Sequence, residues 1–71
     1  MNMYSVGDRV LINELGHGKY GEGLINPRDC FGTVTHEELE FRWVTVMWDN
    51  GQKNTYEPFT LDVVVNSLEN V

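Results

Sequence analysis

Trp48-Asp49-Asn50-Gly51 carries the strongest turn signal in this sequence of 71 residues, and a run of strand-forming residues from Phe41 leads into it. Asn and Gly tolerate the positive φ angles that tight hairpin turns require. Successive side chains of a strand point to opposite faces, so every second residue of the run shares a face. We therefore expect an inner face of Val44, Val46 and Trp48, and an outer face with Trp43 and Met47.

Two lengths of this hairpin turn are compatible with the sequence. A two-residue turn pairs Val46 with Thr55. A three-residue turn with Gly51 in a bulge pairs Val46 with Asn54 and brings Tyr56 opposite the preceding inner valine. We prefer the three-residue turn, because it places Tyr56 on the core face.

The other strands are predicted from short runs of β-favouring residues between turn signals. Pro58 ends the strand after the hairpin, because proline lacks the N–H that strand pairing needs. The predicted strands are residues 9–13, 32–36 and 41–48, the segment before Pro58, and residues 61–65. Asn66 to Val71 is expected to form a loosely held tail.

Residues 16–32 are predicted to form one long glycine-rich loop. This segment contains five glycines and one proline, and it shows no sustained period of 2 or 3.6 residues. No other segment shows a convincing helical period either. A loop of this length in a compact domain is usually functional.

These segments predict an all-β fold with a single domain over residues 1–65. A chain this short buries only about 60% of its unfolded surface and cannot form two cores. Five short strands, a long first loop and a tight hairpin favour a small SH3-like barrel, and an open oligonucleotide-binding barrel is the alternative. The expected core consists of Val6, Val10, Ile12, Val34, Val44, Val46, Trp48, Tyr56, Leu61 and Val63.

Composition restricts the class of partner and the compartment. Eleven acidic and five basic residues give a formal net charge of −6. Binding to DNA or RNA depends on Lys and Arg side chains that replace counterions at phosphates, so this balance argues against a nucleic-acid partner. The single Cys30 excludes an internal disulfide and fits a reducing compartment. Because no long apolar segment is present, we expect a cytoplasmic protein without a signal peptide or membrane span.

A pattern over about residues 6 to 65 combines Gly23, Gly32-Thr33-Val34, the segment 44–51, Asn54-Thr55-Tyr56 and Leu61-Asp62. In this pattern the chain resembles the Mind bomb/HERC-type domain. The resemblance implies an SH3-like barrel that recognises proteins or peptides and that is commonly attached to ubiquitin ligases. Leu61-Asp62 reverses the family's usual order, and no zinc-finger or ligase region accompanies the domain. A chain that begins at Met1 and has this length suggests a small bacterial or phage protein with the same fold.

No catalytic site, metal site or cofactor is predicted. The segment Gly16 to Gly21 matches the Gly-x-Gly-x-x-Gly pattern, but dinucleotide binding needs a strand before the glycines and a helix N-terminus after them. We expect a loop there instead, with Lys19 and Tyr20 at its tip. The residues that could ligate a metal lack the pairwise spacing of metal sites; they are His17, Asp29, Cys30 and His36.

The eight aromatic residues exceed what a barrel of this size can bury, so some are expected at the surface. We predict that four of them line a groove between the long loop and the hairpin, with three carboxylates at its rim. The aromatic residues are Tyr20, Phe31, Trp43 and Phe59, and the carboxylates are those of Glu22, Asp49 and Glu57.

Carboxylates beside aromatic rings favour a basic or proline-rich peptide as the ligand. The predicted function is therefore that of a non-enzymatic protein- or peptide-binding module. Two alternatives remain open at this point, a nucleic-acid-associated barrel of the same fold and a phage-encoded acidic inhibitor of a host protein. The sequence leaves the oligomeric state undetermined.

Overall fold

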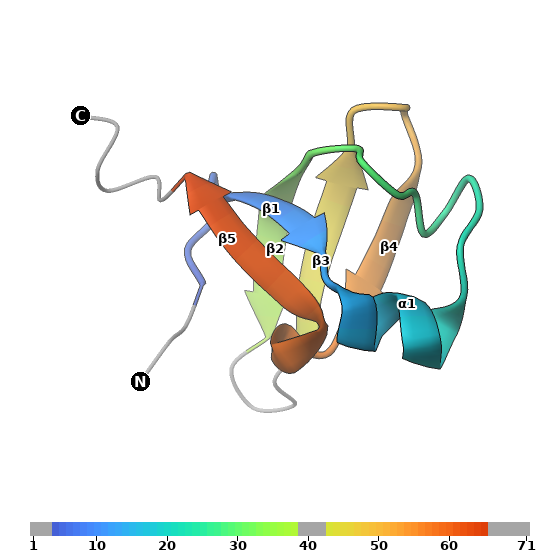
Figure 1. Cartoon of the computed structure of the whole chain (residues 1–71). Helices are drawn as coiled ribbons and strands as arrows, with labels where there is room; N and C mark the ends of the chain where they lie inside the picture. Colours follow the sequence, from blue (N-terminus) through green and yellow to red (C-terminus); the bar gives the residue numbers. More distant parts are fainter. Residues whose placement is uncertain (1–3, 39–42, 66–71) are drawn as a thin grey trace.

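The computed structural model describes residues 4–38 and 43–65, and the five strands in this part of the chain form one antiparallel sheet (Figure 1). They lie in the order β4-β3-β2-β1-β5, so β5 returns to pair with β1. The expectation of a mostly β fold with five strands is confirmed. The strands are β1 (Arg9–Ile12), β2 (Gly32–Glu38), β3 (Trp43–Trp48), β4 (Lys53–Tyr56) and β5 (Leu61–Val65). Phe41 and Arg42, predicted to begin the third strand, and the predicted tail from Asn66 lie outside the described residues.

The sheet is not closed into a barrel, because β4 and β5 form its two edges and do not pair with each other. The Trp48 N–H donates to the carbonyl of Gln52, so by the alternation of antiparallel pairing the Thr55 N–H points away from β3. The Asn54 Oδ1 accepts that outward N–H at 2.9 Å. With this donor occupied and Pro58 close behind, β4 offers little backbone for a further strand.

The hairpin between β3 and β4 has the predicted register. Val44 pairs with Tyr56 and Val46 pairs with Asn54, as the three-residue turn requires. Gly51 has a φ of 92°, in the left-handed region that glycine adopts without strain. Its N–H donates to the Trp48 carbonyl, which closes the turn. The inner and outer faces of β3 are also as predicted, with valines and Trp48 buried and Trp43 and Met47 exposed.

The core contains eight of the ten residues expected from the sequence, and two expectations are wrong. Val6 is 62% exposed in the turn before β1, and Val63 is 39% exposed on an edge strand that has a neighbour on one side only. Tyr4, which was not expected, is buried in their place. Its hydroxyl lies 2.6 Å from the Pro58 carbonyl and 2.9 Å from that of Leu61, so both ends of the described chain meet there.

The prediction of an irregular loop from Gly16 is wrong at its start, because α1 (Glu14–Tyr20) occupies this position. Asn13 caps the helix, and its Oδ1 accepts the Gly16 N–H at 2.9 Å. The helix ends at Gly21, which has a φ of 81°. Two glycines within seven residues weaken the helical signal in the sequence. Lys19 and Tyr20 lie in the last turn of this helix, and not at a loop tip as predicted.

Residues 21–31 contain no helix or strand, and Figure 1 shows this segment running from α1 alongside β4 to the hairpin end of the sheet. Asn26 fastens it. Its amide donates to the Tyr20 carbonyl, and its Oδ1 lies 2.8 Å from the Tyr56 hydroxyl. At the hairpin, the Asn50 amide donates to the Leu24 carbonyl at 2.9 Å.

A 3-10 turn, η1 (Pro58–Thr60), links β4 to β5 and packs against α1. Within residues 4–38 and 43–65, no helix has the length and apolar character needed to cross a membrane.

Candidate functional site

The seven predicted ligand residues fall into separate places on the molecule. Tyr20, Glu57 and Phe59 come together where α1 meets η1, whereas Phe31 and Asp49 meet at the hairpin end of the sheet. Each of these two places also contains a basic residue that the sequence analysis did not assign to the site. We name them the Lys19 cluster (Lys19, Tyr20, Glu57, Phe59) and the Arg9 cluster (Arg9, Phe31, Thr33, Asp49).

In the Lys19 cluster, one carboxylate oxygen holds both polar partners. The Tyr20 hydroxyl donates to Glu57 Oε1 at 2.8 Å, and the Lys19 ammonium forms an ion pair with the same oxygen. The Lys19 Nζ also lies 5.3 Å from the centre of the Phe59 ring and 5.8 Å from that of Tyr20. A cation at such distances from ring faces is attracted by their quadrupoles. The cluster is thus a cation held between a carboxylate and two aromatic rings.

Local structure explains why these four side chains meet. The last turn of α1 carries Lys19 and Tyr20, and η1 begins directly after Glu57 because Pro58 suits the first turn of such a helix. The Tyr20 ring packs edge-on against Tyr56, with 5.7 Å between the ring centres. The cluster therefore rests on the core through Tyr56, while the Phe59 ring is 51% exposed.

The charges of the Lys19 cluster reinforce each other. The hydrogen bond from Lys19, and next that from Tyr20, lower the pKa of the Glu57 carboxyl below its ordinary value. The hydrogen bond with Glu57 in turn raises the pKa of Lys19. Burial, followed by the bond to Glu57, raises the pKa of the Tyr20 hydroxyl. At neutral pH the cluster contains an ammonium, a carboxylate and a neutral phenol.

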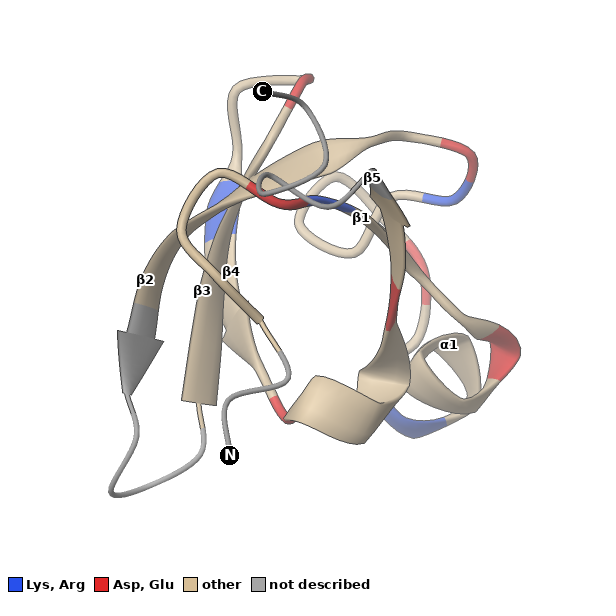
Figure 2. Cartoon of the chain, turned by 90° about the vertical axis from the view of Figure 1, so that its left-hand side faces the viewer, with Lys and Arg blue, Asp and Glu red and all other residues tan. Residues whose placement is uncertain are grey.

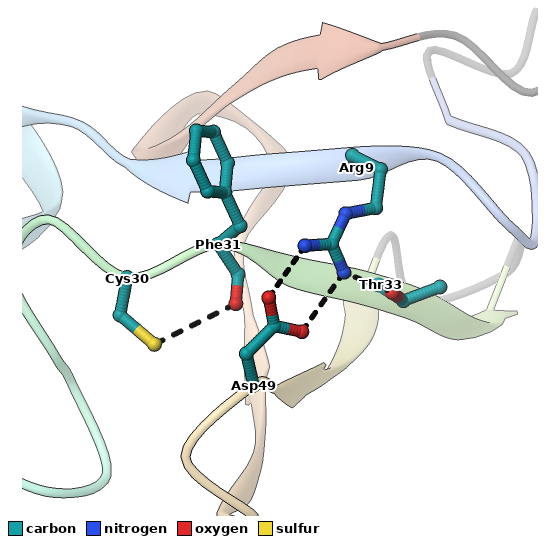
Figure 3. Close-up of polar contacts among 5 residues, drawn as sticks. All are labelled: Arg9, Cys30, Phe31, Thr33 and Asp49. Atoms are coloured by element: carbon teal, nitrogen blue, oxygen red, sulfur yellow. Dashed lines mark hydrogen bonds and ion pairs between the residues drawn. The ribbon is translucent and has the colours of Figure 1, made fainter.

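The Arg9 cluster holds its cation in a different geometry (Figure 3). Both terminal nitrogens of Arg9 donate to Asp49, at 2.9 Å to Oδ1 and 2.5 Å to Oδ2, which makes a bidentate pair. One of them also donates to Thr33 Oγ1 at 2.7 Å, and the guanidinium carbon lies 5.7 Å from the centre of the Phe31 ring. The hydrogen bond from Arg9 lowers the pKa of Asp49. The Cys30 thiol points toward the Phe31 carbonyl at 3.6 Å.

Glu22 and Trp43 belong to neither cluster. Glu22 shares Arg28 with Glu14, at N···O distances of 3.0 and 2.5 Å. Trp43 is the first residue of β3, on the outer face, and is 41% exposed. It immediately precedes the Val44–Tyr56 pair, and so belongs to the same end of the hairpin as Glu57.

Lys19 and Arg9 were not predicted as site residues, because neither lies near its partner carboxylate in the sequence. Lys19 and Glu57 are separated by 38 positions, and Arg9 and Asp49 by 40. No local signal in the sequence links either pair, because the two partners of each meet only through the order of the strands and the position of η1.

In the part of the chain that the structure describes, acidic and basic positions are interspersed, and Arg9, Lys19 and Arg28 all have carboxylate partners (Figure 2). The same residues, 4–38 and 43–65, contain no group of three His, Cys, Asp or Glu side chains that could hold a metal ion. Chemically, the two clusters each hold one of the chain's own cations beside a carboxylate and at least one aromatic ring.

These ion pairs predict a dependence of stability on acid. The Arg28 hydrogen bonds lower the pKa values of Glu14 and Glu22, so the folded chain releases these protons more readily than the unfolded chain. Their contribution to stability is complete above the unfolded pKa, about 4, and is lost as the pH falls below it. Thermal unfolding is measured at about pH 7 and pH 3. The melting temperature of Arg28→Gln should fall less between these two pH values than that of the wild type. Lys53→Gln, the matched charge control on β4, should behave as the wild type; equal acid losses in all three proteins would contradict the assignment.

The two clusters are two versions of one arrangement, with the ammonium of Lys19 in one and the guanidinium of Arg9 in the other. Each contains an exposed phenylalanine ring, Phe59 in one and Phe31 in the other. The buried aromatic residues of the core are Tyr4, Trp48 and Tyr56. No relative supplies a ligand for either arrangement, because the chain matches no protein-family model, no curated protein and no solved structure.

Proposed function

We propose that this protein is a non-enzymatic binding module of SH3-like type that recognises a basic or proline-rich segment of another protein. The strand order supports the SH3-like relationship, since four strands follow in sequence and the fifth returns to the first. The 3-10 turn before the last strand and the tight hairpin support it as well. The resemblance of the sequence to the Mind bomb/HERC-type domain agrees with this proposal.

The observation that carries the function is the Lys19 cluster, in which Glu57, Phe59 and Tyr20 already hold a cation. Exposed aromatic rings next to a carboxylate are the kind of surface that binds a basic side chain, because ring faces and carboxylates both attract cations. Phe59 and Trp43 also offer flat apolar surface on which proline rings of a ligand could pack.

The charge distribution favours a protein ligand over a nucleic acid. Of the basic residues within 4–38 and 43–65, Arg9, Lys19 and Arg28 are held by carboxylates, which compete with phosphates for them. The net charge of −6 adds a general repulsion toward a polyanion and a general attraction toward a basic segment.

A titration followed by NMR tests the proposal. Uniformly 15N-labelled protein is mixed with blocked peptides that are lysine-containing, arginine-containing, proline-rich or glutamate-containing. We expect the basic or proline-rich peptides to shift the amide signals of residues 19–21 and of Glu57, Phe59 and Thr60, and the glutamate peptide to shift none. Phe59→Ala should weaken binding by roughly tenfold through loss of ring contacts. Val64→Ala, an exposed apolar control on β5, should not. If none of the basic or proline-rich peptides shifts any signal at millimolar concentration, the proposed function is wrong.

A further inference from the structure

We infer that Tyr20, Glu57 and Phe59 form a binding site for the primary ammonium group of a partner's lysine, and that Lys19 occupies this site as an internal competitor. This inference rests on the proposed function and adds the chemical class of the recognised side chain and a means of regulation. It follows from how the site is built, how weakly Lys19 is held and which cation the geometry fits.

Contacts that do not involve Lys19 hold Glu57 and Tyr20 in place. The Glu57 carbonyl accepts the Thr60 N–H at 3.1 Å and the Thr60 hydroxyl at 2.6 Å, and these bonds fix the backbone of the residue that carries the carboxylate. The Tyr20 hydroxyl donates to Glu57 Oε1 at 2.8 Å, and the Tyr20 ring rests on Tyr56. These contacts constrain the carboxylate and one ring without the participation of Lys19.

Lys19 is held only at the surface. Its side chain is 46% exposed, and it lies in the last turn of a helix of seven residues. Ion pairs of exposed lysines contribute little to stability, because water and salt screen the charges and ordering the long side chain costs entropy. A partner lysine can therefore replace Lys19 at small cost, and Lys19 is then released into solvent.

The geometry of the Lys19 cluster is that of an ammonium site. In the Arg9 cluster, both oxygens of Asp49 accept from one guanidinium. In the Lys19 cluster, a single oxygen, Oε1 of Glu57, accepts from both the Tyr20 hydroxyl and the ammonium. A compact charge with rotating donors suits a contact to one oxygen, whereas arginine binds best when both carboxylate oxygens accept in parallel.

The experiment compares three proteins and three probes. Wild type, Lys19→Ala and Lys53→Ala are titrated with a blocked five-residue peptide that has one lysine between prolines, and with its arginine and norleucine counterparts. Lys53 is the matched control, since its removal changes the net charge equally and it has no ion pair with a carboxylate among the described residues. Circular dichroism checks that each variant is folded.

Lys19→Ala should bind the lysine peptide about fivefold more tightly than the wild type, the gain expected when an exposed ion pair no longer competes. Lys53→Ala should differ from the wild type by less than about twofold. Glu57→Gln in the Lys19→Ala background should abolish the preference for lysine over norleucine. The lysine peptide should also bind more tightly than the arginine peptide.

The possible failures are distinguishable. Equal binding of the lysine peptide by wild type and Lys19→Ala would overturn internal competition but leave the proposed function intact. Equal binding of the lysine and norleucine peptides would overturn the ammonium site. Absence of binding by all three proteins to every probe would overturn the inference, and with it the proposed function if the broader peptide titration also shows no shifts.

Discussion

Gly16→Ala is expected to lower the free energy of unfolding by about 2 kcal/mol, as overpacking of a tight contact does. A Cβ at this position would lie 2.6 Å from Ile12 Cγ2 and 2.6 Å from the Thr60 carbonyl oxygen. The latter atom belongs to the backbone and cannot move aside as a flexible side chain can. Because stability for a chain of this size is on the order of 5 kcal/mol, the loss is a large fraction of the total.

Gly18→Ala is the matched control for this substitution, since it lies in the same helix with no atom within 4 Å of the added Cβ. We expect it to raise the free energy of unfolding by roughly 0.5–1 kcal/mol, because alanine favours the helix and loses less entropy on folding than glycine. Urea unfolding followed by circular dichroism measures both values. A stability of Gly16→Ala equal to or above that of the wild type would show that α1 does not pack against η1 as closely as described.

Tyr56→Phe is the second change with a large expected effect, a loss of about 2 kcal/mol in the free energy of unfolding. The Tyr56 hydroxyl accepts the buried Trp48 Nε1–H at 2.9 Å, and phenylalanine would leave this donor without its partner. The same hydroxyl lies 2.5 Å from the Ile25 carbonyl. The substitution therefore also removes a hydrogen bond that holds the segment 21–31 to β4.

Two measurements separate these consequences of Tyr56→Phe. Urea unfolding reports the global loss, and amide hydrogen exchange should show faster exchange in residues 21–31 even under native conditions. Tyr20→Phe serves as a control, because its hydroxyl bonds the surface carboxylate of Glu57, and we expect a loss below about 1 kcal/mol. A stability of Tyr56→Phe equal to that of the wild type would mean that water replaces the hydroxyl.

The parts of the fold that the sequence predicts are those determined by neighbouring residues. The hairpin register follows from Gly51 and from the need to place Tyr56 on the core face, and both are local properties. Helix α1 instead brings Gly16 close to Thr60, 44 positions away, in a contact that no periodicity reports. Burial of Tyr4 likewise requires carbonyl acceptors supplied by the far end of the chain.

The candidate site was predictable only by residue type. Aromatic and acidic side chains were expected at the surface, and Phe31, Trp43 and Phe59 are exposed. Their division into two cation-holding clusters arises from the approach of α1 to η1 and of β1 to the hairpin. Such approaches are set by packing across the whole sheet, so the basic members Lys19 and Arg9 could not be assigned from spacing in the sequence.

The Asn54 amide that accepts the Thr55 N–H on the outer side of β4 has a consequence for the protein in concentrated solution. An open sheet presents an edge that can template strands of other molecules, and long unprotected edges lead to polymerisation. Here one outward donor is occupied by a side chain, and the lysine at the start of β4 adds a charge that repels its own copies. The occupied donor and the lysine charge therefore disfavour edge-to-edge pairing of molecules through β4.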